Sequence, residues 1–179
     1  LDSIGKEVFW NNSGVRNFVI PGTVKTIGSN SFYGCTKVSV LRFKDGEEEL
    51  EIDNSNTRSR KIDNIIFNVA SSSDRKKYQD RKYDYFYDCP VQTLYLGRDL
   101  KYHNSDATEI YDKIDSYTWK NTKRASAPFI NNKTLKRVTI GSKVKLLHHH
   151  LFDGCSNLQS ISYPASLAYI GDYAFENCI

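Results

Sequence analysis

A spaced set of apolar positions repeats along this chain with a period of 23 residues. The clearest copy consists of Phe152, Cys155, Leu158, Ile161 and Tyr163. Related copies begin at Phe9, Phe32, Phe86, Phe129 and Phe175. A fixed period of this length is typical of a solenoid, in which each repeat forms one rung and stacked rungs share a continuous core. The sequence therefore predicts about six stacked rungs.

The residues within one repeat predict two different faces for each rung. Residues 158–163 end in period-2 alternation, which indicates a short strand. Leu167 and Ile170 are expected to point inward from a second face, and Gly171 to permit a tight turn at positive φ. Residues 172–175 predict one helical or 3₁₀ turn. We therefore expect an α/β repeat solenoid with a parallel β-sheet on one face and short helical turns on the other.

All four cysteines occupy one position of the repeat. In two further copies this position holds asparagine; the six residues are Asn12, Cys35, Cys89, Asn132, Cys155 and Cys178. A position shared by Cys and Asn requires a small side chain that can form hydrogen bonds to the backbone inside a turn. The register therefore favours free, buried thiols. Disulfides between neighbouring rungs remain an alternative, because stacked strands lie only about 4.8 Å apart.

Two segments carry a recognisable form of this repeat. Residues 26–35 (TIGSNSFYGC) and 169–178 (YIGDYAFENC) resemble the BspA-like leucine-rich repeat, which is common in cell-surface proteins of anaerobic bacteria. The resemblance covers residues 1–43, 86–102 and 129–179. It implies a single leucine-rich-repeat domain over residues 1–179, which we expect to be a fragment of a longer chain.

The same resemblance implies a function. It predicts a non-catalytic, bacterial cell-surface or secreted binding module, with no cofactor, that mediates adhesion through protein–protein interaction. The expected partners are host extracellular-matrix proteins or other cell-surface proteins. Two alternatives stay open: a glycan-binding module that uses aromatic side chains, and a structural spacer that presents neighbouring domains.

Two insertions interrupt the period, at about residues 44–85 and 103–128, and add 31 and 20 residues to it. At the start of the first insertion, Asp45-Gly46 lies between the apolar residues 41–43 and 50–52, which predicts a β-hairpin. In repeat proteins, insertions emerge on one face and often form the binding surface. The rest of the chain gives fewer reasons to expect a ligand.

Aromatic and basic residues concentrate in and beside these insertions, where eight of the 12 tyrosines lie between Tyr78 and Tyr117. Tyr and Arg are enriched at interface hot spots because they combine rigid contact area with a polar tip. The alternative is a half-buried lid over the solenoid. The candidate partner-binding residues are Tyr78, Arg81, Tyr83, Tyr85, Tyr111, Tyr117 and Trp119.

Charge and motifs argue against several other functions. The 25 basic and 21 acidic residues give a net charge of +4, which is too small to predict specific nucleic-acid binding. Lys133, Lys136, Lys143 and Lys145 could form a basic strip, although exposed solenoid lysines are the commoner explanation. No apolar run approaches the roughly 20 residues of a transmembrane helix. No nucleophile elbow, phosphate loop or dinucleotide motif predicts an enzyme.

Two clusters of titratable residues could hold a metal ion. The first is His148-His149-His150, for which a solvated turn is favoured over a site built from His148, His150 and Asp153. The second is the acidic run 47–51, for which a charged hairpin edge is favoured over a calcium site or a catalytic carboxylate pair. We therefore expect no metal and no catalytic residue.

Overall fold

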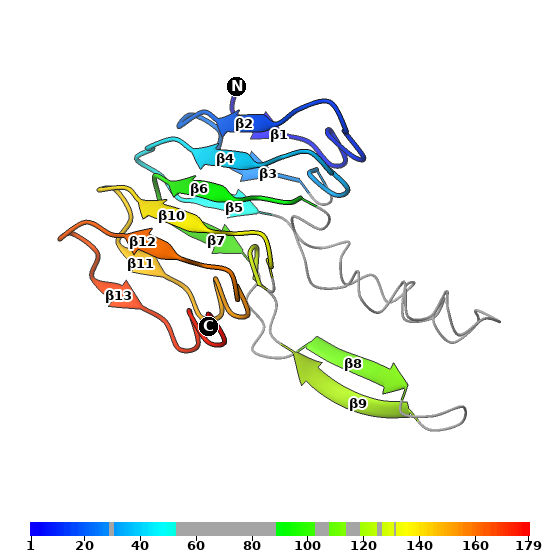
Figure 1. Ribbon diagram of the computed structural model, residues 1–179. Helices are drawn as coiled ribbons and strands as arrows, with labels where there is room; N and C mark the ends of the chain where they lie inside the picture. Colours follow the sequence, from blue (N-terminus) through cyan, green and yellow to red (C-terminus); the bar gives the residue numbers. More distant parts are fainter. Residues whose placement is uncertain (29–30, 53–88, 103–107, 114–118, 125–126, 131) are drawn as a thin grey trace.

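The computed structural model describes residues 1–28, 31–52, 89–102, 108–113, 119–124, 127–130 and 132–179; for 108–113 and 119–124 it describes the backbone only. Within these residues the chain forms a stack of rungs with its two ends at opposite ends of the stack (Figure 1).

Five parallel strands form the main sheet, one strand from each rung. They are β2 (Asn17–Ile20), β4 (Val40–Phe43), β6 (Thr93–Leu96), β10 (Arg137–Ile140) and β12 (Ser160–Ser162), in the spatial order β12-β10-β6-β4-β2. Asn17 pairs with Val40, and Arg137 pairs with Ser160, so these partners are 23 residues apart. Val40 pairs with Thr93 across the first insertion in the same register. The insertions therefore interrupt the sequence period without interrupting the sheet.

Short parallel strands also line the other face of the rungs. The second sheet contains β1 (Ser3–Ile4), β3 (Thr26–Ile27), β5 (Leu50–Ile52) and β7 (Leu100–Tyr102), in that order, while β11 (Leu146–Leu147) pairs with β13 (Tyr169–Ile170). The described residues contain no helix. The short helical turns expected at residues 172–175 were therefore wrong: this segment is a hydrogen-bonded turn, in which Ala174 N donates to Gly171 O at 3.2 Å and Tyr173 has a left-handed φ of 58°.

The predicted hairpin around Asp45-Gly46 was also wrong. β4, before this turn, belongs to the main sheet, whereas β5, after it, pairs in parallel with β3 and β7 of the second sheet. Leu50 and Ile52 thereby enter the core, with exposed fractions of 0% and 4%. Residues 50–52 are thus part of a rung. The only hairpin in the described chain is formed by β8 (Thr108–Lys113) and β9 (Trp119–Arg124), which pair antiparallel.

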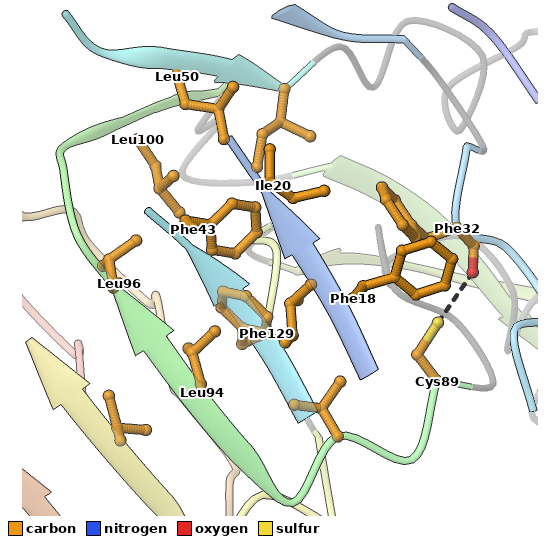
Figure 2. Close-up of a cluster of buried hydrophobic side chains, with 14 of the residues drawn as sticks. Phe18, Ile20, Phe32, Phe43, Leu50, Cys89, Leu94, Leu96, Leu100 and Phe129 are labelled. Atoms are coloured by element: carbon orange, nitrogen blue, oxygen red, sulfur yellow. Dashed lines mark hydrogen bonds between the residues drawn. The ribbon is translucent and has the colours of Figure 1, made fainter. Parts of the chain in front are cut away.

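The core lies between the two faces of the stack. Along the main strands buried and outward positions alternate, as in β2, where Phe18 and Ile20 are buried and Val19 is exposed. Figure 2 shows Leu50 and Leu100 of the second sheet beside Phe43 of the main sheet. The phenylalanine position of the repeat is buried at Phe32, Phe129 and Phe152 and partly buried at Phe9 and Phe175.

Glycine serves two different purposes in the turns. Gly34 and Gly154 have positive φ values of 70° and 72°, and asparagines occupy the matching left-handed position in other rungs. Gly28 and Gly171 do not have positive φ, so the prediction for the Gly171 turn was wrong. A Cβ on Gly28 would lie 2.6 Å from the backbone nitrogen of Lys6 in the preceding rung. This glycine position is therefore required by the close approach of stacked backbones.

The cysteines form hydrogen bonds from one rung to the one before it. Each thiol donates to the carbonyl of a phenylalanine in the preceding rung, with Sγ–O distances of 3.1 Å for Cys35 to Phe9, 2.8 Å for Cys89 to Phe32, 3.1 Å for Cys155 to Phe129 and 3.1 Å for Cys178 to Phe152. Figure 2 shows the Cys89 bond. Asparagine bonds differently: Asn12 Oδ1 accepts from Gly14 N and Val15 N within its own turn.

All four cysteines are free thiols, as the sequence predicted, but only three of them are buried. Cys178, in the last rung of this chain, is partly exposed. The burial of Cys155 raises the pKa of its thiol to about 12, which keeps it protonated and unreactive at neutral pH. The position shared by Cys and Asn is therefore structural, because both residues satisfy backbone groups inside the stack.

Exposure predicts the order in which these thiols react. We expect iodoacetamide to modify Cys178 in the native protein well before Cys35, Cys89 and Cys155, because reagents reach a buried thiol only after local unfolding. Peptide mass spectrometry after timed quenching measures the four rates, and denatured protein, in which all four sites react, is the control. Native modification of Cys35 as fast as that of Cys178 would contradict the packing described here.

Candidate partner-binding face

The partner-binding residues predicted from the sequence lie in or next to the insertions. Five of them lie outside the residues that the structure describes, namely Tyr78, Arg81, Tyr83, Tyr85 and Tyr117. Tyr111 lies in β8 opposite Asn121, and Trp119 lies in β9 opposite Lys113, but their side chains are not described. The prediction that these residues form a binding surface therefore stays a prediction, as does the alternative that they form a lid.

The main sheet offers a second candidate surface, which the sequence analysis missed. Its outward side chains come from alternate positions of adjacent strands, and we call them the outer sheet face. Val19 on this face is 46% exposed, and Arg42 is exposed as well. The face consists of Val19, Val40, Arg42, Thr93, Tyr95, Arg137 and Thr139.

Arg42, Tyr95 and Asp45 form a connected group at the centre of this face. The guanidinium carbon of Arg42 lies 4.6 Å from the centre of the Tyr95 ring, within the range of a cation–π interaction. The Tyr95 hydroxyl donates a hydrogen bond of 2.5 Å to Asp45 Oδ1. This bond raises the pKa of the Tyr95 phenol, which therefore stays protonated as a donor at neutral pH. The aromatic ring is thus held in one orientation before any partner arrives.

The turn after β4 positions this group. Asp45 is close to the glycines of three other rungs, Gly22, Gly97 and Gly141. A Cβ on Gly97 would meet the Asp45 backbone nitrogen at 2.5 Å, and one on Gly141 would lie 3.1 Å from Asp45 Oδ1. Glycine at these positions makes room for the Asp45 turn and for the Tyr95 hydroxyl. The local sequence therefore fixes the carboxylate over the strand that carries Tyr95.

A second arginine extends the positive charge along the face. Arg137 on β10 donates from Nη2 to Thr93 Oγ1 on β6 at 3.2 Å. Lys44, at the end of β4, is exposed. Cations next to exposed apolar and aromatic side chains are typical of surfaces that recognise acidic partners.

The acidic run 47–51 has a different role from the one predicted. β5 lies between β3 and β7, so these carboxylates do not protect a sheet edge. Each of three glutamates forms an ion pair with a lysine of another rung: Glu47 with Lys143 at 2.8 Å, Glu48 with Lys25 at 3.0 Å and Glu51 with Lys101 at 3.3 Å. In these exposed pairs each carboxylate lies next to a lysine of another rung. Lys143 therefore forms an ion pair with Glu47 rather than being part of a basic strip.

The repeat register contains the signal that would have found the outer sheet face. Val19, Arg42, Tyr95 and Thr139 occupy equivalent positions, each between two buried residues of its strand. These positions are outward-facing in every rung. Their residue types are free to vary because the core does not constrain them, so an arginine next to a tyrosine at this position is a candidate binding feature.

Comparisons with solved structures return bacterial leucine-rich repeat proteins. One from Bacteroides ovatus is 21% identical, with a TM-score of 0.45. The alignment covers 100% of this chain, which spans 39% of the length of the Bacteroides ovatus protein. The Treponema pallidum protein TpLRR is 15% identical, with a TM-score of 0.41. The alignment covers 96% of this chain and 67% of TpLRR. A leucine-rich cell surface protein from Faecalibacterium prausnitzii is 18% identical, with a TM-score of 0.22 and coverages of 98% and 62%.

The comparison with curated proteins gave no significant match. No helix capable of crossing a membrane occurs in the part of the chain that the structure describes. The family described as "BspA type Leucine rich repeat region" matches residues 2–79 and 122–179, in six copies. This match covers most of the chain and confirms the family inferred from the repeat, but its extent differs from the one expected: it includes residues 44–79 and leaves out residues 86–102. The chain therefore belongs to the BspA-type leucine-rich repeat family.

Proposed function

We propose that this chain is a non-catalytic adhesion module, located at the bacterial surface or outside the cell, that binds a protein partner through the outer sheet face. Membership of the BspA-type leucine-rich repeat family supports a protein-binding role. The expected partners are host extracellular-matrix proteins or proteins on other cells.

The observation that carries the proposal is the group formed by Arg42, Tyr95 and Asp45. Two types of residue that dominate interface energetics lie in contact here, and the hydroxyl bond to Asp45 restrains the tyrosine. A restrained side chain loses little conformational entropy on binding. Val19, which pairs with Arg42, and Val40, two residues before Arg42 on β4, supply apolar area beside this group.

The charge of the face defines the partner further. Arg42 on β4 and Arg137 on β10 carry positive charge on either side of β6, and Arg137 donates a hydrogen bond to Thr93 on β6. A guanidinium binds carboxylates with two parallel hydrogen bonds. We therefore propose a partner that presents an acidic segment with an apolar or aromatic side chain next to it.

Variants of the face test the proposal against a panel of purified extracellular-matrix proteins in a surface-binding assay. For a partner that binds the wild type, Arg42→Glu and Tyr95→Ala are each expected to weaken binding about 30-fold or more, as for hot-spot residues of about 2 kcal/mol. Lys101→Ala is the matched control, because Lys101 is an exposed residue of β7 on the opposite face. Binding that falls as salt is raised would support the charge argument.

Two results would contradict the proposal. The first is a matrix partner whose affinity does not change in Arg42→Glu and Tyr95→Ala, which would place the binding surface elsewhere. The second is the absence of binding to any protein in the panel together with binding to a glycan array, which would favour the glycan alternative. Circular dichroism of each variant verifies that the fold is intact.

A further inference from the structure

The turns of the last two rungs bring together three side chains that can bind a metal ion. They are His150 and Asp153 from one turn and Glu176 from the next, and one ligand atom from each lies within 4.8 Å of the others. His150 Nδ1 lies 3.1 Å from Asp153 Oδ2. Their side chains are only 15% and 16% exposed. The predicted solvated turn was therefore wrong for His150, which is largely buried beside a carboxylate.

Backbone hydrogen bonds hold the two turns in register. His150 N donates to Asp172 O at 3.1 Å, and Gly154 N donates to Glu176 O at 2.7 Å. His150 also has a φ of 58°, a left-handed conformation that sets the direction of its side chain. The separation between the two turns is therefore set by the stack itself, which places the backbones of the three residues before any ligand binds.

Neighbouring side chains orient two of the three groups. The His150 ring stacks on Tyr173, with ring centres 4.9 Å apart and an interplanar angle of 15°. Asn177 Nδ2 donates to Asp153 Oδ1 at 3.3 Å, which leaves Oδ2 facing His150. Outer contacts of this kind fix the orientation of metal ligands and contribute strongly to metal affinity.

We propose that His150, Asp153 and Glu176 bind a divalent transition-metal ion, with zinc as the best fit. Two ligand atoms on one tetrahedral zinc ion, with bonds of about 2.1 Å, are separated by about 3.4 Å, close to the distance between His150 Nδ1 and Asp153 Oδ2. Glu176 is exposed and can adjust its rotamer to complete the site. An imidazole with two carboxylates suits zinc, whereas calcium prefers oxygen ligands alone.

The other two histidines of the triplet are not part of this site. His149 Nδ1 accepts a hydrogen bond of 2.9 Å from Asp172 N. His148 packs edge-on against Tyr102, with ring centres 5.4 Å apart. The sequence-based alternative of His148, His150 and Asp153 shares two residues with the proposed site, in which Glu176 takes the place of His148.

Because the ligands come from two rungs, the ion connects the last rung of this chain to the one before it. We expect ZnCl₂ to bind the untagged, chelator-treated wild-type chain with a saturable 1:1 isotherm in calorimetry and to raise its melting temperature. The amides of residues 173–178 are expected to exchange more slowly with zinc bound, since binding stabilises the state that binds the ion.

Four variants test the assignment of the ligands. His150→Asn, Asp153→Asn and Glu176→Gln are each expected to weaken zinc binding at least about tenfold. Asparagine is chosen at position 150 because it tolerates the left-handed backbone. Asp172→Asn is the matched control: its carboxylate lies near His149, outside the cluster, and its affinity should equal that of the wild type.

The following results would contradict the proposal. Absence of saturable zinc binding to the wild type would overturn it, as would equal binding by His150→Asn and the wild type. Zinc binding that Glu176→Gln leaves unchanged would overturn the connection between rungs. Glu176 is exposed, so Glu176→Gln is expected to fold even if a change at His150 does not, and the test keeps its readout.

Discussion

Phe152→Ala is expected to lower the free energy of unfolding by about 3–5 kcal/mol, as for other buried Phe→Ala substitutions. Phe152 is 0% exposed. Its ring stacks between Phe129 at 5.8 Å and Phe175 at 5.4 Å, with interplanar angles of 17° and 16°. Alanine would leave a cavity in the middle of this ladder, and both neighbouring rings would lose a packing partner.

Urea denaturation followed by circular dichroism measures the effect, which should appear as a lower transition midpoint. Val19→Ala is the control, because Val19 is an apolar strand residue with 46% of its surface exposed, and its loss should be within about 0.5 kcal/mol. A loss below about 1 kcal/mol for Phe152→Ala would mean that the neighbouring rungs close the cavity, so that the phenylalanine ladder contributes little to the cohesion of the stack.

Arg98→Ala is expected to lower the free energy of unfolding by about 2–4 kcal/mol, although Arg98 lies in a turn between two short strands. Arg98 is 1% exposed, and burial lowers the pKa of its guanidinium. Nη1 donates to Gly22 O and Nη2 to Pro21 O, both at 2.9 Å. Alanine would leave these two carbonyl groups without their donor, and an unsatisfied buried acceptor costs about 1–3 kcal/mol.

Arg98 connects rungs that are not adjacent in the stack. It follows β6, its bonds end on the turn after β2, and it passes beneath Gly46 of the rung between them, where an added Cβ would lie 2.9 Å from Arg98 Cδ. Among the described atoms, Nε has no hydrogen-bond partner. Arg98→Lys should lower the free energy of unfolding by less, about 1–2 kcal/mol, because an ammonium group can still donate to one carbonyl.

Thermal and urea unfolding of Arg98→Ala, Arg98→Lys and the wild type compare the three proteins directly. Lys101→Ala is a matched control for the removal of a nearby cation, because Lys101 is exposed in its pair with Glu51. Arg98→Ala unfolding at the wild-type midpoint would show that water replaces the guanidinium at both carbonyls. The predicted role of Arg98 as a link between rungs would then be wrong.

Much of the fold could be predicted from the sequence because each rung of a solenoid buries the same pattern of apolar side chains. The 23-residue spacing gave the register of the main sheet, and Phe32, Phe129 and Phe152 are buried as their shared position predicts. The common position of the cysteines correctly predicted free thiols. Each of these results depends on the identity of residues within one rung and on the rule that like positions stack.

Local signals were misleading where stacking and local preference disagree. Asp45-Gly46 has the sequence of a hairpin turn, yet Leu50 and Ile52 gain more from burial in the second sheet than from pairing back on β4. Gly28 and Gly171 look like turn glycines with positive φ, but the neighbouring backbone, not the turn, excludes a side chain there. In both cases the deciding contact comes from another rung.

The candidate sites follow the same division. The sequence by itself determined the rungs, their core and the order in which they stack, because these depend on the periodic burial of apolar side chains. Only the tertiary structure placed Tyr95 against Arg42 and Asp45, and Glu176 beside His150 and Asp153. Those groups form between residues of different rungs, and which polar side chains meet there depends on the path of each turn in three dimensions.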